Sequence, residues 1–213
     1  AVSEEAMAVF TNPDVKMNKS IRILQCGDLK NLPRYTGEEE ARHNTLKTLA
    51  DGSVVVAAPL TTSLKSVADL KPASGENKAC GFQESTVAAS EQEKKDLLAA
   101  WYFNINVRSN GVVLVKNGTT VSVGTGEQDR VGAIEQAIAK FKLKYEGEED
   151  IQGSVMSSDG FFPFSDGVET AAAAGVTAVI APAGSLKDAD VIKRANELGV
   201  ALFHAPERIF SHH

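Results

Sequence analysis

The residues with the clearest chemical potential lie between positions 157 and 166, in the sequence Ser-Ser-Asp-Gly-Phe-Phe-Pro-Phe-Ser-Asp, which we call the Phe loop. Three phenylalanines within four positions, with Pro163 removing one backbone donor, fit neither helical nor alternating periodicity. We therefore expect a strand-to-helix loop with at least one ring facing a cavity or a partner. The structural alternative is a hydrophobic plug beneath the loop.

Two arginines stand where they could hold a phosphate. Arg130 follows the turn Gly124-Thr-Gly126 in the first turns of an expected helix, and such Gly-rich turns let backbone amides approach an anion. Arg208 follows the last expected strand. A guanidinium presents a fork of donors to a phosphate, and a Phe ring can stack on a heterocycle. Together these residues suit a phosphorylated, planar ligand, although each arginine alone is more often part of a surface salt bridge.

Other kinds of site lack their residues. The sequence contains neither a His-x-Glu with Cys-x-x-Cys, the pattern of zinc deaminases, nor a Walker loop. Cys26 and Cys80 are too few for a disulfide framework or a Cys-x-x-Cys metal site, and neither has a histidine nearby in sequence. We expect no metal ion and no cysteine nucleophile.

The composition indicates which binding partners and which cellular compartment we expect. The 213 residues include 22 Lys and Arg against 28 Asp and Glu, a net charge of -6, which argues against a general nucleic-acid or membrane surface. No apolar stretch approaches the roughly 20 residues needed to span a bilayer. We therefore expect a cytoplasmic protein without nucleic-acid or membrane partners. The chain starts at Ala1 and not at Met, so we expect a processed start or a part of something longer.

The elements that must position these residues are clearest in the last third. Short strands are expected at 154–156, 177–181 and 200–203, with helices between them, the second of them capped by Ser185. This is a β-α-β-α-β unit. Right-handed crossovers make its strands parallel, so the loop after each strand lies at the same edge of the sheet. We expect three loops to face one site: the Phe loop, the Pro-Ala-Gly-Ser loop (residues 182–185) and the tail after Phe203.

The first two thirds contain weaker signals. A helix with Trp101 in the core is expected after the capping box Ser90-Glu-Gln-Glu93, and Asn117-Gly118 predicts a hairpin between strands at 111–115 and 119–123. The sequence also predicts a helix over 4–10 and strands over 21–25 and 53–58, with loop and short elements over 61–89. We expect two subdomains, residues 1–89 and 90–213.

Several ordered motifs carry a resemblance to a known family. They are Asp96-Leu-Leu with Ala100-Trp101, Arg108-Ser-Asn110, Lys116-Asn-Gly118, Gly124-Thr-Gly-Glu-Gln-Asp-Arg130, Ser158-Asp-Gly-Phe-Phe-Pro-Phe164, Ala181-Pro-Ala-Gly-Ser185 and Arg208-Ile-Phe-Ser-His212. In order and spacing they resemble the second half of the transformylase domain of the bifunctional purine-biosynthesis enzymes that are both AICAR formyltransferase and IMP cyclohydrolase. The resemblance covers residues from about 90 to 213 firmly and the earlier residues loosely.

The resemblance implies a fold and a reaction. The fold would be a three-layer α/β/α fold like that of cytidine deaminase, with a mixed sheet and no zinc. The reaction would move a formyl group from 10-formyltetrahydrofolate to the amine of the imidazole carboxamide ribonucleotide AICAR, in a dimer that shares active sites. By the same carry-over, AICAR would contact Asn110, Arg130, Phe161 and Arg208. The folate would lie near Val131, Asp166, Ser185 and Leu186.

One departure from the family bears on catalysis. The family's Lys-His-x-Asn-Pro motif, which supplies the proton acceptor, is absent from the 213 residues, and so is the cyclohydrolase domain. His212 is the best internal candidate for the base. Two alternatives stay open: a second chain or an amino-terminal segment supplies the Lys-His pair, or the chain is a non-catalytic or regulatory ribonucleotide-binding module. Smaller departures are Gly160 and Thr125, each in place of the usual Ala.

Overall fold

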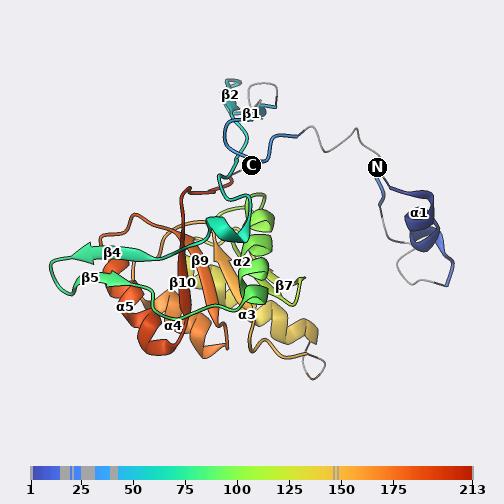
Figure 1. Cartoon of the computed structure of the whole chain (residues 1–213). Helices are drawn as coiled ribbons and strands as arrows, with labels where there is room; N and C mark the ends of the chain where they lie inside the picture. Colours follow the sequence, from blue (N-terminus) through green and yellow to red (C-terminus); the bar gives the residue numbers. More distant parts are fainter. Residues whose placement is uncertain are drawn as a thin grey trace. The chain divides into compact units, whose positions relative to one another are not determined.

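The computed structural model describes residues 2–14, 20, 22–24, 32–38, 43–145, 147 and 149–212 (Figure 1). The chain divides into two compact units, Ala1–Pro33 and Arg34–His213. The first contains α1 (Glu4–Thr11), which begins where the Ser3 hydroxyl accepts a hydrogen bond from the amide of Ala6. The expected helix is therefore confirmed. The strand expected over 21–25 is absent from the described residues 22–24, and Ile21, Gln25 and Cys26 lie outside the described residues.

The second unit is built on a six-stranded mixed sheet in the order β3-β10-β9-β8-β6-β7. Its strands are β3 (Lys71–Pro72), β6 (Val112–Lys116), β7 (Thr119–Gly124), β8 (Val155–Ser158), β9 (Ala178–Pro182) and β10 (Ala201–Ala205). The strands β8, β9 and β10 are parallel, whereas β6 is antiparallel to both of its neighbours and β3 is antiparallel to β10. With α4 (Asp166–Ala173) and α5 (Asp188–Leu198) as crossovers, the predicted β-α-β-α-β unit is confirmed.

Apolar side chains on both faces of the sheet make two cores, because successive residues of a strand point to opposite faces. On one face Met156, Val179 and Leu202 pack with α3 (Arg130–Tyr145), α4 and α5. On the other face Ile180 and Phe203 pack with Leu97 and Trp101 of α2 (Glu91–Asn104). The helices therefore form outer layers on both sides of the sheet, and the expected three-layer α/β/α class with a mixed sheet is confirmed.

The capping box, the hairpin turn and the buried tryptophan that the sequence predicted in this unit are confirmed. The Ser90 amide donates to the Glu93 carboxylate over 2.7 Å, and the Glu93 amide donates back to the Ser90 hydroxyl over 3.2 Å, which completes the capping box of α2. Asn117 and Gly118 have positive φ angles of 51° and 76°, as the turn of the predicted β6–β7 hairpin requires. Trp101 is fully buried, as expected.

Residues 61–89 contain short elements that attach to the sheet. The 3-10 helix η4 (Val67–Asp69) and β3 are followed by a hairpin of β4 (Ser74–Asn77) and β5 (Gly81–Glu84). The amide of Ala73 donates to the carbonyl of Leu202 over 2.8 Å, and the amide of Leu202 donates to the hydroxyl of Ser85 over 3.0 Å. The boundary that we expected between residues 89 and 90 therefore lies inside the second unit, because these hydrogen bonds tie residues 73–85 to β10.

A second hairpin precedes this segment. It consists of β1 (Thr45–Thr48) and β2 (Val54–Ala57), which pair with each other and are exposed along their whole length. The strand expected over 53–58 is confirmed as β2, whereas β1 was not expected. Throughout the described ranges, each helix is too short or too polar to cross a bilayer.

Candidate functional site

The loops after β8, β9 and β10 meet around Arg208. The carbon at the centre of its guanidinium lies 4.9 Å from the centre of the Phe161 ring, a cation–π contact. The same guanidinium lies against Gly184 of the Pro-Ala-Gly-Ser loop, so closely that a Cβ there would be 2.6 Å from Nη2 of Arg208. The three loops that were expected to face one site are therefore in contact.

Arg208 is an exposed cation without an ion pair among the described residues. Its neighbour Glu207 is engaged elsewhere, because the Glu207 carboxylate accepts from the amide of Ser63 over 2.6 Å and from the hydroxyl of Thr62 over 3.1 Å. The alternative of a surface salt bridge between Arg208 and Glu207 is therefore not what the structure shows. The guanidinium of Arg208 makes no hydrogen bond or ion pair with another described residue.

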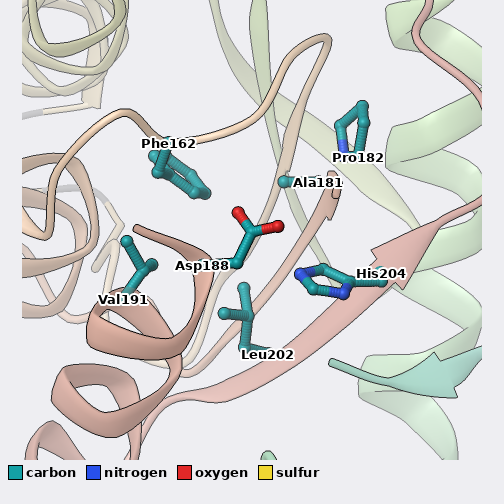
Figure 2. A pocket seen from close by; sticks show the side chains of 7 residues that line it. All are labelled: Phe162, Ala181, Pro182, Asp188, Val191, Leu202 and His204. Atoms are coloured by element: carbon teal, nitrogen blue, oxygen red, sulfur yellow. The ribbon is translucent and has the colours of Figure 1, made fainter. Parts of the chain in front are cut away.

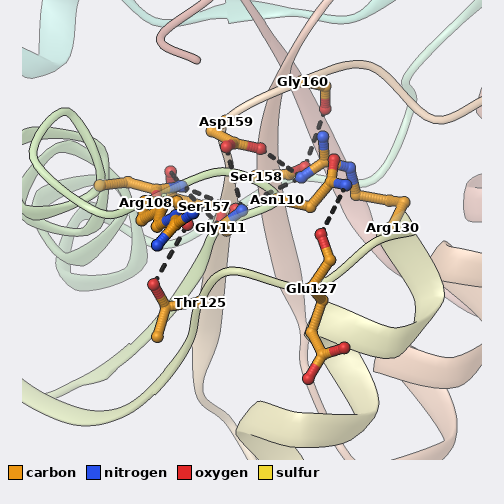
Figure 3. Close-up of polar contacts among 11 residues, drawn as sticks. Arg108, Asn110, Gly111, Thr125, Glu127, Arg130, Ser157, Ser158, Asp159 and Gly160 are labelled. Atoms are coloured by element: carbon orange, nitrogen blue, oxygen red, sulfur yellow. Dashed lines mark hydrogen bonds and ion pairs between the residues drawn. The ribbon is translucent and has the colours of Figure 1, made fainter. Parts of the chain in front are cut away.

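The other expected arginine, Arg130, is buried. It is the first residue of α3, and Figure 3 shows it among its polar neighbours. Its Nη1 forms an ion pair with Asp159, and the two side chains are 7% and 0% exposed. Nη1 also donates to the carbonyl of Gly111 over 3.4 Å. The Nε of Arg130 is buried without a hydrogen-bond partner among the described residues. A buried donor without a partner costs free energy, and the protein encloses this atom on all sides.

Asn110 lies beside this ion pair. Its side-chain amide donates to the carbonyl of Glu127 over 3.0 Å, and the next residue, Gly111, donates its backbone amide to Asp159 over 2.9 Å. The tail also binds Asp159, through its backbone, because the amide of Ile209 donates to the carbonyl of Asp159 over 3.2 Å. Asn110, Arg130 and Arg208 are therefore connected through Asp159, and Phe161 through its contact with Arg208.

This place of Asp159 was not predicted, and the residue appeared above only as part of the Phe loop. A signal was present, since an aspartate directly after a strand of a β-α-β unit stands at the edge where ligands bind.

The three phenylalanines of the Phe loop have different environments. Phe161 is half-buried against Arg208, Phe162 is 3% exposed and belongs to the core, and Phe164 is 61% exposed. The hydrophobic-plug alternative therefore applies to Phe162, whereas Phe161 is the ring that faces the site.

The residues expected near the folate lie on these same elements. Val131 is half-buried at the start of α3, and Asp166 is exposed at the start of α4, where its carboxylate accepts from the Gly167 amide over 2.8 Å. Leu186 is 93% exposed. Among the described residues, no hydrogen bond links Val131 or Asp166 to Ser185 or Leu186. Their role with a folate stays a prediction.

Ser185 does not cap α5, contrary to our expectation. The helix begins at Asp188 after Lys187, and the Asp188 carboxylate accepts from the amides of Gly184 and Ser185 over 2.8 and 3.2 Å. The hydroxyl of Ser185 instead accepts from the amide of Lys187 over 3.0 Å. Ser185 thus lies two residues before the N-cap position, in a turn that the Asp188 carboxylate holds through the amides of Gly184 and Ser185.

His212, the expected base, is exposed near the end of the tail. Its backbone carbonyl accepts from Nζ of Lys47 on β1 over 3.2 Å, and its imidazole makes no hydrogen bond with another described residue. The neighbouring tail is anchored, since the amide of Ser109 donates to the carbonyl of Ser211 over 2.8 Å. The catalytic role of His212 stays a prediction.

A small cavity lies beneath the Pro-Ala-Gly-Ser loop. Figure 2 shows its lining residues, Phe162, Ala181, Pro182, Asp188, Val191, Leu202 and His204. Its volume of about 10 Å³ suits a single water molecule and not a nucleotide. Burial lowers the pKa of the His204 imidazole, and the nearby Asp188 carboxylate opposes that shift. In the part of the chain that the structure describes, no group of three His, Cys, Asp or Glu side chains could hold a metal ion.

The sequence matches a known protein family and is similar to individual named proteins. Residues 1–140 match the family described as AICARFT/IMPCHase bienzyme. The bifunctional purine biosynthesis protein PurH of Anoxybacillus flavithermus is 46% identical over 123 residues, which are 58% of this chain and 23% of that protein. PurH of Corynebacterium glutamicum (strain R) is 42% identical over 144 residues, 68% of this chain and 27% of that protein. The chain thus spans about a quarter of the length of these relatives.

A solved structure also aligns with the chain. The crystal structure of dCMP deaminase from the cyanophage S-TIM5, in complex with dCMP and dUMP, covers 54% of this chain and 97% of its own chain, with 21% sequence identity and a TM-score of 0.36.

Proposed function

Since this chain belongs to the AICARFT/IMPCHase bienzyme family, we propose that it acts in purine (IMP) biosynthesis in the cytoplasm, in the transfer of a formyl group from 10-formyltetrahydrofolate to the amine of AICAR. The observation that carries this proposal is the pair of arginines with unused donors. Arg208 is exposed and without an ion pair among the described residues, and the buried Nε of Arg130 lacks a hydrogen bond within the same ranges.

These donors support an anionic, planar ligand. Arg208 would hold the phosphate by charge-assisted hydrogen bonds, and Phe161 beside it offers a ring face to a heterocycle. Arg130 and Asn110 would take the polar groups of the imidazole carboxamide, because they lie together at Gly111 and Asp159.

The reaction asks for more than binding. The exocyclic amine of AICAR is a weak nucleophile, so its attack needs a general base, and the oxyanion at the formyl carbon needs donors. His212 is the internal candidate for the base. We propose Val131, Asp166, Ser185 and Leu186 as the folate side of the site.

We further propose that a second chain supplies the remaining groups, in a homodimer or in a complex. The observation behind this proposal is in the sequence, where no Lys is followed by His at any of the 213 positions. A partner that carries the Lys-His-x-Asn-Pro motif would bring both a cation and a base to the formyl carbon.

A single-turnover assay tests the reaction. The chain is mixed with AICAR and 10-formyltetrahydrofolate, alone and with the amino-terminal part of a PurH relative that contains the Lys-His motif. We expect slow or no transfer by the chain alone and transfer by the mixture, with a matched mixture that carries His→Ala in that motif as the inactive control. If no combination transfers the formyl group, the proposed enzymatic function is wrong.

The second candidate is a non-catalytic or regulatory ribonucleotide-binding module. The observation that favours it is the same missing Lys-His pair. It predicts about micromolar AICAR affinity by calorimetry, no effect of folate on that affinity, and no formyl transfer. Tighter AICAR binding in the presence of the folate would argue for the enzyme.

A further inference from the structure

Asp159 is a fully buried acid whose polar groups all have partners. One carboxylate oxygen pairs with Nη1 of Arg130, and the other accepts from the amide of Gly111 over 2.9 Å (Figure 3). Its backbone amide donates to the carbonyl of Gly111 over 3.1 Å, and its carbonyl accepts from the amide of Ile209 over 3.2 Å. Asp159 is therefore fixed on every side.

Each hydrogen-bond partner of Asp159 is either a residue of the candidate site or the residue that directly follows one. Arg130 is bound directly, Gly111 directly follows Asn110, and Ile209 directly follows Arg208. These residues come from separate parts of the chain: the start of α3, the start of β6 and the tail. Asp159 itself stands at the end of β8, the strand beside β6.

The pairing also decides how Arg130 is oriented. A buried guanidinium needs a compensating charge, and Asp159 takes up Nη1 while Nε stays without a partner among the described residues. Gly160 limits the guanidinium from another side, since a Cβ there would lie 2.6 Å from Nη2 of Arg130 and 2.3 Å from Cε1 of Phe210. The guanidinium is thus held with one edge used by the protein and another edge unused.

We propose that Asp159 is a positioning residue that fixes Arg130, and the backbone next to Asn110 and Arg208, in one arrangement before a ligand binds. Preorganisation of this kind raises affinity because less ordering remains to be done on binding. The inference rests on the proposed AICAR site, but the orientation of Arg130 is measurable without any ligand. Asp159 need not touch the ligand to act in this way.

The test uses Asp159→Asn, which keeps the shape and an acceptor for Gly111 but removes the charge that holds Arg130. AICAR titrated by calorimetry should bind roughly 10- to 150-fold more weakly, the range for a hydrogen bond to a charged group. Glu169→Gln is the matched control, because it removes an acid from an exposed pair with Arg194 and should change the affinity by less than about 2-fold.

A nuclear magnetic resonance measurement separates positioning from general support of the fold. In the parent protein the nitrogen-15 signal of Arg130 Nε should be resolved and its proton should exchange slowly, because the atom is buried. In Asp159→Asn that protection should be lost while the backbone spectrum away from the site stays unchanged. Fast exchange of this proton in the parent overturns the proposal without any variant.

A second variant guards against loss of folding. Removing one member of a buried pair can prevent folding, so Asp159→Glu, which keeps the charge but moves the carboxylate by one methylene, should fold and still lose affinity for AICAR. Either variant, folded and with an AICAR affinity within about 2-fold of the parent, overturns the proposal. If the parent binds no AICAR, the proposed function is wrong. The exchange rate of the Arg130 Nε proton, in the parent and in Asp159→Asn, then tests the positioning role of Asp159 by itself.

Discussion

At the scale of residues, the two arginines of the site are prepared in opposite ways. Arg208 is exposed, with its guanidinium over the Phe161 ring, whereas Arg130 is buried and paired with Asp159. An exposed arginine loses side-chain freedom when it binds, but it can follow a phosphate as the ligand enters. A buried arginine is already ordered. The first suits capture of a charged group and the second suits recognition of shape.

Arg208→Ala tests the phosphate contact. We expect AICAR binding to weaken by about 1.5 to 3 kcal/mol, roughly 10- to 150-fold, because charge-assisted hydrogen bonds are lost. Arg208→Lys should recover only part of the loss, since lysine keeps the charge but lacks the planar fork. Calorimetric titration of AICAR measures both variants.

The unphosphorylated riboside of AICAR is the control ligand for Arg208→Ala. If Arg208 holds the phosphate, the riboside should bind the parent and the variant almost equally. Equal losses for both ligands, or no loss for either, would show that Arg208 is not the phosphate anchor. Folding should hardly change, because Arg208 is exposed and has no ion pair among the described residues.

Single residues of the site were predictable from sequence only in part. Arg130 and Arg208 stood out by type and by place in their elements, and the Phe loop stood out by composition. The pairing of Arg130 with Asp159 could not be predicted, because it joins residues 29 positions apart through the order of strands in the sheet. The choice of Phe161 over Phe162 as the ring that faces the site also depends on how the loop leaves β8.

At the scale of elements, the strands that were predicted correctly are those with strong local signals. β8, β9 and β10 are runs of buried residues separated by amphipathic helices, which is the pattern of parallel strands. β3 has only two residues, Lys71 and Pro72, and exists because it pairs with β10. β1 has no such signal either, since all of its residues are exposed.

The β6–β7 hairpin depends on an acid from a different element. Asp96 of α2 is 3% exposed, and its carboxylate accepts from the amides of Asn117 and Gly118 over 2.8 Å each. We expect Asp96→Ala to lower the free energy of unfolding by about 1 to 3 kcal/mol, because two turn amides lose their acceptor. Urea unfolding monitored by Trp101 fluorescence measures the change.

Asp51→Ala is the matched control for Asp96→Ala. Asp51 also accepts from a turn amide, that of Ser53 over 3.0 Å, but its turn is exposed and water can replace the carboxylate. Its loss should therefore be clearly smaller. Equal effects of the two substitutions would mean that Asp96 does not hold the hairpin to α2.

At the scale of the whole molecule, the second unit joins an early segment and its last strand through the sheet and its hydrogen bonds. Residues 71–85 and the final strand β10 are neighbours, although most of the unit lies between them in sequence. Because of this contact, residues 71–85 belong to the same compact unit as residues 90–213, and that unit begins at Arg34. Local patterns predict helices and strands, whereas the pairing of distant strands depends on the complete fold.

The pH dependence of the free energy of unfolding can test the contact between β3 and β10, because His204 lies at this contact. It lies on β10, with Lys71 of β3 as its cross-strand neighbour and Asp188 of α5 across the small cavity (Figure 2). Burial lowers the pKa of His204 below its usual value of 6.5, and the Asp188 carboxylate opposes this shift. The unfolded chain therefore binds a proton at His204 at a higher pH than the folded protein does.

The sign of the pH dependence follows from this difference. Where the unfolded state binds more protons, stability falls as the pH falls. We expect the free energy of unfolding, measured with urea, to decrease as the pH is lowered from 7.5 through 6.5 toward 5, and His204→Gln to reduce that decrease because no proton is then taken up at this position. His212→Gln is the matched control, since that ring is exposed and its loss leaves the surroundings of β10 untouched. A slope over this range that is the same in His204→Gln and in the parent would contradict a lowered pKa of the half-buried His204 at the junction of β3, β10 and α5.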